Sequence, residues 1–193
     1  MSKLRKGIGK EPLSTSLRKA LRLADRLAIN DLRDWCCLEL GGYWASNPVM
    51  TDDVVVPEYR SVVGQHADIY GRPLMVPANL SFVNETRLRN GVEELETLST
   101  TRDVVAIHDP HMCELIQEHL NVQVYAFRFS SVHVTGVLAA IALELEQRLG
   151  AVEPQVKANG PVEPANESEI LELRPNFYGI GLNLRALWRR WRG

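Results

Sequence analysis

Apolar residues recur at helical spacing in five stretches of the chain. Between Leu13 and Ala28 they mark one face of a helix, with arginines and a lysine on the other faces. A second apolar stripe follows, in which Asn30 and Asp31 are expected to cap a helix that ends at Gly41. Further helices are predicted over residues 84–98, 110–120 and 131–149.

Two other regions have the composition of β-strands. Residues 54–56 and 59–63 are β-branched or aromatic at most positions, and they predict two or three short strands before Val76. Side chains alternate in character from Val122 to Phe129, which predicts another strand. We therefore expect an α+β fold, in which an N-terminal helical hairpin and a long later helix pack on a small, mainly antiparallel sheet.

Composition divides the chain into four parts. Residues 1–12 mix lysines and an arginine with glycines and lack apolar periodicity, so they predict a mobile basic arm. The α+β domain is expected over residues 13–150. Residues 151–169 contain prolines and several glutamates with few large apolar residues, which predicts a flexible linker. Residues 170–193 form a basic tail rich in tryptophan and arginine.

Net charge and cysteine usage bear on the expected partners and on the cellular compartment. The formal charge of -2 over 193 residues offers no whole-chain attraction to nucleic acid. Cys36, Cys37 and Cys113 are an odd set with two adjacent members, which indicates free thiols in a reducing compartment. No apolar run reaches the roughly 20 residues that span a bilayer, and the first residues lack a secretory apolar stretch. We expect a cytoplasmic protein.

The densest group of potential metal ligands surrounds one short predicted helix and comprises His108, Asp109, His111, Cys113 and His119. His111 and His119 are two turns apart, and Cys113 points elsewhere, so these side chains do not converge on one ion. A capped helix with surface histidines explains the group better. We predict no metal site.

Catalytic groupings have equally simple structural explanations. Ser130, Ser131 and His133 lie close together, but the serines occupy the position of a helix cap. Cys36 lies on the inward stripe of its helix, which favours an inert, buried thiol. No phosphate-binding loop has the required spacing. The catalytic residues are therefore unknown, no cofactor is predicted, and a non-enzymatic role is favoured.

The tail is the clearest candidate for binding. Leucines and tryptophans share one side of a helix predicted over residues 182–191, and arginines surround it. The residues expected to bind are Arg185, Trp188, Arg189, Arg190 and Trp191. Such a segment suits docking on its own domain, a partner protein or a membrane surface. Nucleic acid is less favoured because no strand with an aromatic platform for bases can be identified.

Three segments carry a family resemblance: residues 17–24, residues 32–43 with their Leu-Glu-Leu-Gly-Gly-Tyr run, and residues 56–60 with Pro-Glu-Tyr-Arg. Together with residues 138–149, they resemble the AbiTii domain family, which is associated with bacterial abortive infection and other anti-phage conflict systems. The resemblance covers about residues 13–150, implies a role in phage defence and names no reaction. Glu39 and Arg60 are its polar site candidates.

Two interpretations of this motif remain open. Glu39 and Arg60 could form part of a functional site, or they could close a packing corner built from Trp35, Tyr43 and their apolar neighbours. The favoured function is a non-enzymatic binding or interaction module of a defence system, acting through a protein partner or self-association. The alternatives are a toxin enzyme, either hydrolase or nuclease, and a membrane-directed effector that uses the basic tail.

Overall fold

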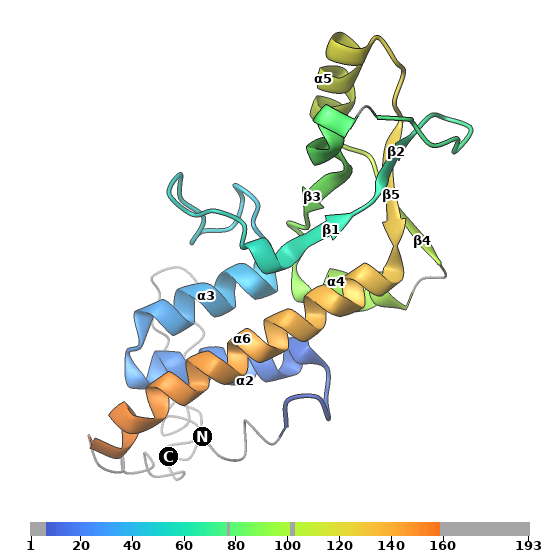
Figure 1. The fold of residues 1–193 in the computed structure, drawn as a ribbon. Helices are drawn as coiled ribbons and strands as arrows, with labels where there is room; N and C mark the ends of the chain where they lie inside the picture. Colours follow the sequence, from blue (N-terminus) through green and yellow to red (C-terminus); the bar gives the residue numbers. More distant parts are fainter. Residues whose placement is uncertain (1–6, 77, 101–102, 159–193) are drawn as a thin grey trace, which may run out of the picture. The chain divides into compact units, whose positions relative to one another are not determined.

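The computed structural model describes residues 7–76, 78–100 and 103–158 (Figure 1). The helices are α2 (Leu13–Leu27), α3 (Asn30–Gly41), α4 (Val92–Ser99), α5 (Pro110–Leu120) and α6 (Ser131–Ala158), with short 3-10 helices η1 (Glu58–Arg60) and η2 (Ala78–Asn84). The strands are β1 (Ser61–Val63), β2 (Gln65–Ala67), β3 (Glu85–Arg87), β4 (Val104–Ile107) and β5 (Ala126–Ser130). The predicted α+β class is confirmed.

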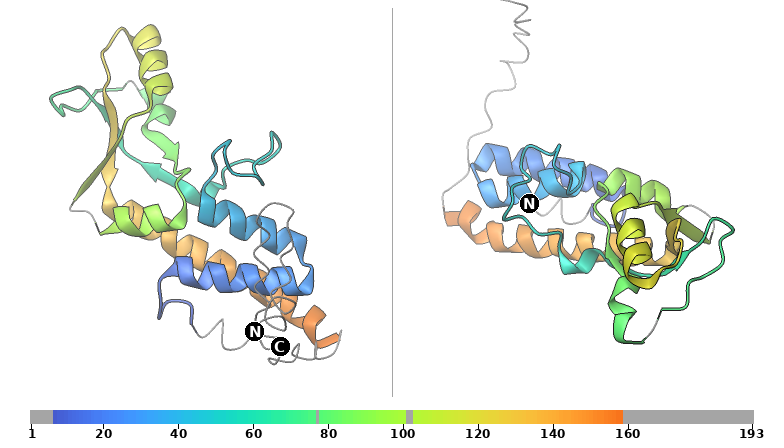
Figure 2. Two further views of the ribbon diagram at one scale, coloured as in Figure 1. Left: turned by 180° about the vertical axis from the view of Figure 1, so that it is seen from behind. Right: turned by 90° about the horizontal axis from the view of Figure 1, so that it is seen from above.

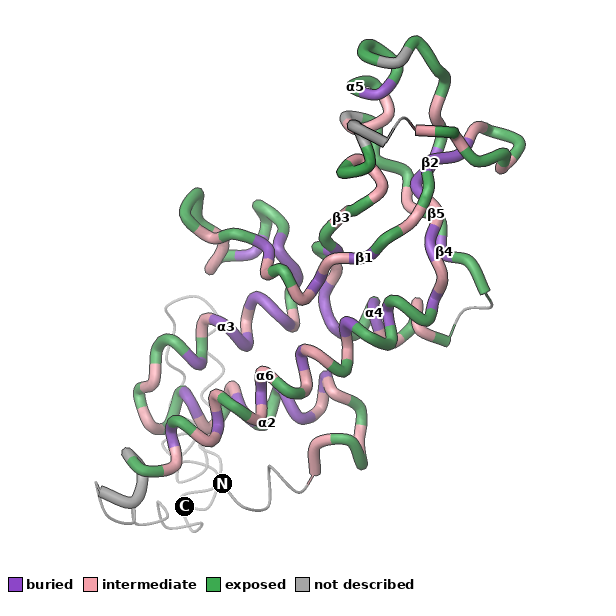
Figure 3. The backbone as a smooth tube through the Cα atoms, in the orientation of Figure 1, coloured by how far each residue is buried: buried purple, intermediate pink, exposed green. Residues whose placement is uncertain are grey.

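Helix α6 is the element against which α2 and α4 pack. Its buried positions follow helical spacing and are Val134, Val137, Ile141, Leu145, Leu149 and Val152. They contact α2 and α4, and α6 also contacts η1 and β1 (Figure 2). In Figure 3 buried positions recur along α6 and α2. The predicted start at Ser131 and the inward stripe are confirmed.

Helices α2 and α3 form the predicted N-terminal hairpin. Leu17, Ala20 and Ala24 are fully buried on α2, and the small alanines allow close packing against α3. Ala28 takes a left-handed conformation with φ 53°, and this ends α2. Asn30 and Asp31 do not cap α3 as predicted, because Ile29 is the N-cap residue and no side chain bonds there. The predicted end at Gly41 is confirmed.

The strands form two small antiparallel sheets in the described residues. β1 pairs with β3, while β2 and β4 flank β5 in the order β2-β5-β4. Gly64 separates β1 from β2 at the point where the chain changes sheets. A Cβ atom there would lie 2.4 Å from the carbonyl oxygen of Arg128, so only glycine allows this close crossing of two backbones.

One predicted helix was wrong in part. Residues 84–98 were expected to be one helix, yet residues 85–87 form β3 and α4 begins only at Val92. Gly91 is the N-cap of α4, and a Cβ atom on it would lie 2.3 Å from the carbonyl oxygen of Leu40. The backbone N–H of Leu88 donates to the Arg60 carbonyl instead of entering a helix. Tertiary contacts therefore override the apolar spacing.

The predicted strand positions also need correction. Residues 54–56 form no strand, and the first strand is β1 at Ser61. Between Val122 and Phe129, only residues from Ala126 onward are strand, although the Tyr125 N–H still donates to the Ala67 carbonyl. Pairing with β2 and β4 is confined to residues 126–130, and this decides where β5 begins.

Helical structure and core contacts extend beyond residues 13–150 at both ends. Helix α6 continues to Ala158, so residues 151–158 of the expected linker are helical. Val152 is buried and extends the inward stripe by one turn, which stabilises this continuation. Residues 7–11 of the expected arm form a turn, and Ile8 packs against the core. Residues 1–6, the rest of the linker and the tail lie outside the described residues.

Candidate functional site

Glu39 and Arg60, the two polar candidates from the family motif, meet inside the protein. Glu39 lies in the last turn of α3, and Arg60 ends η1 immediately before β1. Arg60 Nη2 lies 2.5 Å from Glu39 Oε2, and both side chains are 0% exposed. The structure thus brings the two candidates together, but it places them where solvent does not reach.

Tyrosine hydroxyls complete the bonding of the carboxylate. Tyr43 Oη donates to Glu39 Oε1 at 2.8 Å, and Tyr59 Oη donates to the same oxygen at 2.7 Å. Trp35 Nε1 in turn donates to Tyr59 Oη at 3.1 Å. With Arg60 on the other oxygen, every carboxylate oxygen of Glu39 has a donor, which is the condition for keeping a charge buried.

Arg60 ties this carboxylate to a distant part of the chain. Its Nη1 donates to the carbonyl oxygens of Leu88 and Asn90, both at 2.8 Å. Its guanidinium also stacks over the Tyr43 ring, with Cζ 4.8 Å from the ring centroid. Helix α3, η1 and the segment between β3 and α4 are therefore joined at one point.

Burial sets the protonation of the groups around Glu39. It raises the pKa of Tyr43 and Tyr59 well above the ordinary tyrosine range, and the negative charge of Glu39 adds to the effect. Both hydroxyls therefore stay protonated and keep donating. Burial likewise raises the pKa of the nearby Cys36 thiol to about 12, so this thiol is protonated and unreactive at neutral pH.

The geometry favours the packing corner over a reactive site. A general acid or base needs hydrogen-bond reach to a substrate, and the bonds and burial of Glu39 and Arg60 leave no such reach. Trp35 and Tyr43, the expected neighbours, belong to the corner. Tyr59 was missed as a member, although its place in the Pro-Glu-Tyr-Arg segment beside Arg60 was the available signal.

The histidines lie elsewhere and do not converge on this ion pair. His66 is buried on β2, its Nε2 lies 2.9 Å from the Val83 carbonyl oxygen, and burial lowers its pKa. His108 contacts Tyr125, and His119 bonds to the Leu115 carbonyl oxygen of its own helix. Within residues 7–76, 78–100 and 103–158, no three His, Cys, Asp or Glu side chains are grouped to hold a metal ion.

Asp109 has a structural role that the sequence predicted. Its side-chain oxygen accepts a hydrogen bond from the Met112 N–H, and Pro110 occupies the first turn of α5. This capping arrangement satisfies a backbone donor that would otherwise lack a partner. The predicted start of α5 is confirmed.

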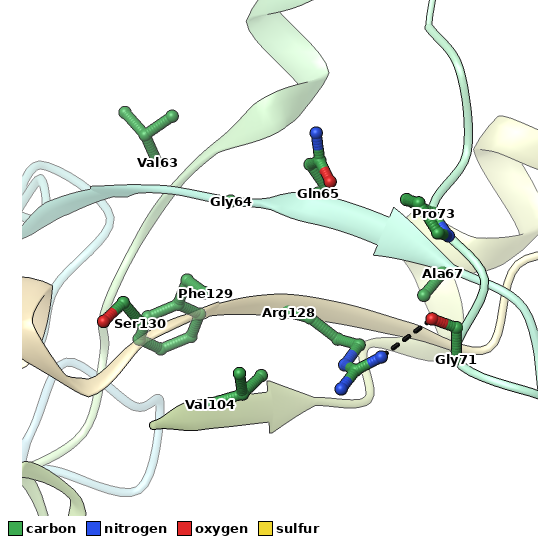
Figure 4. A pocket seen from close by; sticks show the side chains of 10 residues that line it. All are labelled: Val63, Gly64, Gln65, Ala67, Gly71, Pro73, Val104, Arg128, Phe129 and Ser130. Atoms are coloured by element: carbon green, nitrogen blue, oxygen red, sulfur yellow. Dashed lines mark hydrogen bonds between the residues drawn. The ribbon is translucent and has the colours of Figure 1, made fainter. Parts of the chain in front are cut away.

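Surface features outside the motif offer room for binding. Large apolar side chains are exposed between β2 and the end of η2, where Ile69 is 68%, Tyr70 76%, Met75 89% and Phe82 68% exposed. A pocket of about 550 Å³ lies over sheet β2-β5-β4 and contains Arg128 (Figure 4). Arg128 was not singled out from the sequence, since a single arginine in a strand carries no motif.

The described chain is thus an α+β protein in which a buried ion-pair centre joins a helical bundle to small antiparallel sheets. A family model described as AbiTii matches residues 3–168, and the chain belongs to the AbiTii family. The resemblance predicted from the motifs is confirmed, and membership indicates a component of an abortive-infection anti-phage system. No curated protein and no solved structure matches the chain.

Two further findings concern membrane spanning and the tail. None of the described helices has the length and apolar character needed to cross a membrane. The candidate binding residues Arg185, Trp188, Arg189, Arg190 and Trp191 all lie outside the described residues. Their role stays a prediction.

Proposed function

We propose that this chain is a cytoplasmic, non-enzymatic binding module of an abortive-infection system, which acts through a protein partner or through self-association. The exposed apolar residues between β2 and the end of η2 carry the proposal. Tyr70, Met75 and Phe82 are each at least two-thirds exposed, and all three fall within residues 70–82. Several large apolar side chains exposed in one segment favour binding to another protein.

The buried motif residues also support a non-enzymatic function. Glu39 and Arg60 are the polar residues of the matching segments, and their hydrogen bonds serve the fold. The family motif then has a structural reason to exist that requires no reaction. We therefore place partner binding on the exposed surface.

Replacing two of the exposed residues tests this function. We expect the Tyr70→Ser, Met75→Ser double variant to lose phage protection in an efficiency-of-plating assay, because it removes apolar contact area from the binding surface. Its melting temperature should stay close to that of the wild type, since both side chains are largely in solvent. Light scattering after size exclusion would show whether self-association is lost as well.

Val55 and Val132 supply the matched control. Each is 70% exposed, and each lies outside the segment between β2 and η2. The Val55→Ser, Val132→Ser double variant should protect cells as the wild type does. Full protection by the Tyr70/Met75 variant, or cleavage of nucleic acid or nucleotides by the purified protein, would contradict a non-enzymatic module of this kind.

The tail supports a second binding proposal. We propose that residues 182–191 form a helix that buries Trp188 and Trp191 against a protein surface, because exposed indoles and leucines would leave an apolar stripe in water. Membrane binding is the competing outcome, favoured by about 1 kcal/mol per arginine near anionic lipid.

Truncation after Ser168 separates these outcomes. We expect the truncated chain to lose partner binding or oligomeric state together with phage protection. Co-sedimentation of the full chain, but not of the truncated chain, with anionic liposomes would favour the membrane instead. Unchanged binding, oligomeric state and protection would show that the tail is dispensable.

A further inference from the structure

The face of sheet β2-β5-β4 that carries Arg128 contains a pocket. Phe127 and Phe129 point into the core on one face of β5, and Arg128 and Ser130 therefore lie on the other face. Arg128 is paired across the sheet with Gln65 on β2 and Ala106 on β4. Small residues that line the pocket beside the long arginine, Gly64, Ala67 and Gly71, leave a volume of about 550 Å³, and Figure 4 shows the lining residues.

The charge of Arg128 has no carboxylate partner among the described residues. Its Nη1 donates to the Gly71 carbonyl at 2.8 Å, and no described residue accepts from the other two nitrogens. Among the residues that the structure describes, Arg128 is also the one charged residue that lines this pocket. By contrast, the exposed Arg72 nearby is paired with Asp68 at 2.7 Å.

The turn between β2 and η2 holds Arg128 in place. Asp68 organises this turn by accepting from the Tyr70 and Arg72 N–H groups, both at 2.9 Å. Gly71 has φ +77°, and a Cβ atom on it would lie 2.7 Å from Arg128 Nη1. The turn therefore directs a carbonyl at one nitrogen of the guanidinium and leaves the other two available, which preorganises a fork for an anion.

Apolar groups form the rest of the pocket. Val63, Val104 and Pro73 line it, together with the amide of Gln65 and the hydroxyl of Ser130. A volume of this size is typical of sites for small organic molecules. A ligand that suits apolar walls and one fixed cation is a flat apolar molecule that carries a negatively charged group.

We propose that this pocket binds a small organic anion, with Arg128 recognising a carboxylate, sulfonate or phosphate group and the valines contacting the apolar body. Such a ligand goes beyond the proposed function, which includes no small molecule. The purified full-length chain is sufficient to test the pocket.

A pair of dyes that differ by one charged group provides the test. Anilinonaphthalene sulfonate should bind roughly tenfold more tightly than the uncharged phenylnaphthylamine, and a tenfold ratio corresponds to about 1.4 kcal/mol. Fluorescence titration measures both affinities. The Arg128→Gln variant should lose most of this preference for the sulfonate, and amide NMR shifts on titration should centre on Gly64, Gln65 and Ser130.

Val104 provides a second variant that leaves Arg128 in place. It is 45% exposed at the pocket wall, so a polar residue there keeps the fold. Val104→Asp should weaken the sulfonate severalfold more than Val104→Asn, because only the aspartate repels an anion. Equal affinities for these two variants, an unchanged preference in Arg128→Gln, or NMR shifts centred on residues 74–82 would overturn the proposal.

Discussion

Replacing Glu39 with alanine is expected to lower the free energy of unfolding by about 3–5 kcal/mol, the usual cost of leaving one partner of a buried ion pair uncompensated. Arg60 would keep its charge at a position that is 0% exposed, and it would retain only carbonyl acceptors. Tyr43 and Tyr59 would each lose their acceptor as well. Urea unfolding followed by tryptophan fluorescence measures the change.

Glu144 is the matched control for this replacement. It forms a salt bridge with Arg148 at 2.7 Å, but both side chains are partly exposed and lie one turn apart on α6. Glu144→Ala should therefore cost less than about 1 kcal/mol. The Glu39→Gln, Arg60→Met double variant should be more stable than Glu39→Ala, since it leaves no unpaired charge. A Glu39→Ala protein as stable as Glu144→Ala would contradict the structural role of the ion pair.

Leu145→Ala is expected to cost about 2–5 kcal/mol, because it opens a cavity in a core that cannot fully collapse around it. Leu145 is 0% exposed on α6 and belongs to the main apolar cluster, where α6 meets α2 and α4. Alanine has high helix propensity, so the loss reports packing and not the helix itself. Urea unfolding measures it.

Leu143 provides the comparison on the same helix. Its side chain is 57% exposed, so Leu143→Ala should change the free energy of unfolding by no more than about 0.5 kcal/mol. Similar losses for the two variants would mean that the inward face of α6 has been assigned incorrectly.

The buried centre explains why the matching segments of the family occur together. Residues 32–43 supply Trp35, Glu39 and Tyr43, and residues 56–60 supply Tyr59 and Arg60. All five side chains meet in one bonded group. Loss of any member is expected to lower stability, and lower stability alone can reduce phage protection, so plating assays on these residues require parallel stability measurements.

Local periodicity in the sequence was sufficient to predict most helices. The apolar stripes of α2, α3 and α6 repeat every three or four residues, and the Asp109 cap marks the start of α5. These signals act within a few turns, so one sequence contains them completely. The motif residues likewise identified the family, because short runs of specific residues can be recognised in the sequence without knowledge of the fold.

The tertiary structure alone decided what depends on distant partners. Residues 85–87 are a strand because β1 pairs with them, although their spacing suits a helix. Arg60 is buried because Glu39 neutralises its charge and the carbonyl oxygens of Leu88 and Asn90 accept its hydrogen bonds. Arg128 lines a pocket because the small residues Ala67 and Gly71 line it too. Each outcome depends on contacts between residues tens of positions apart, and neither propensity nor periodicity carries that information.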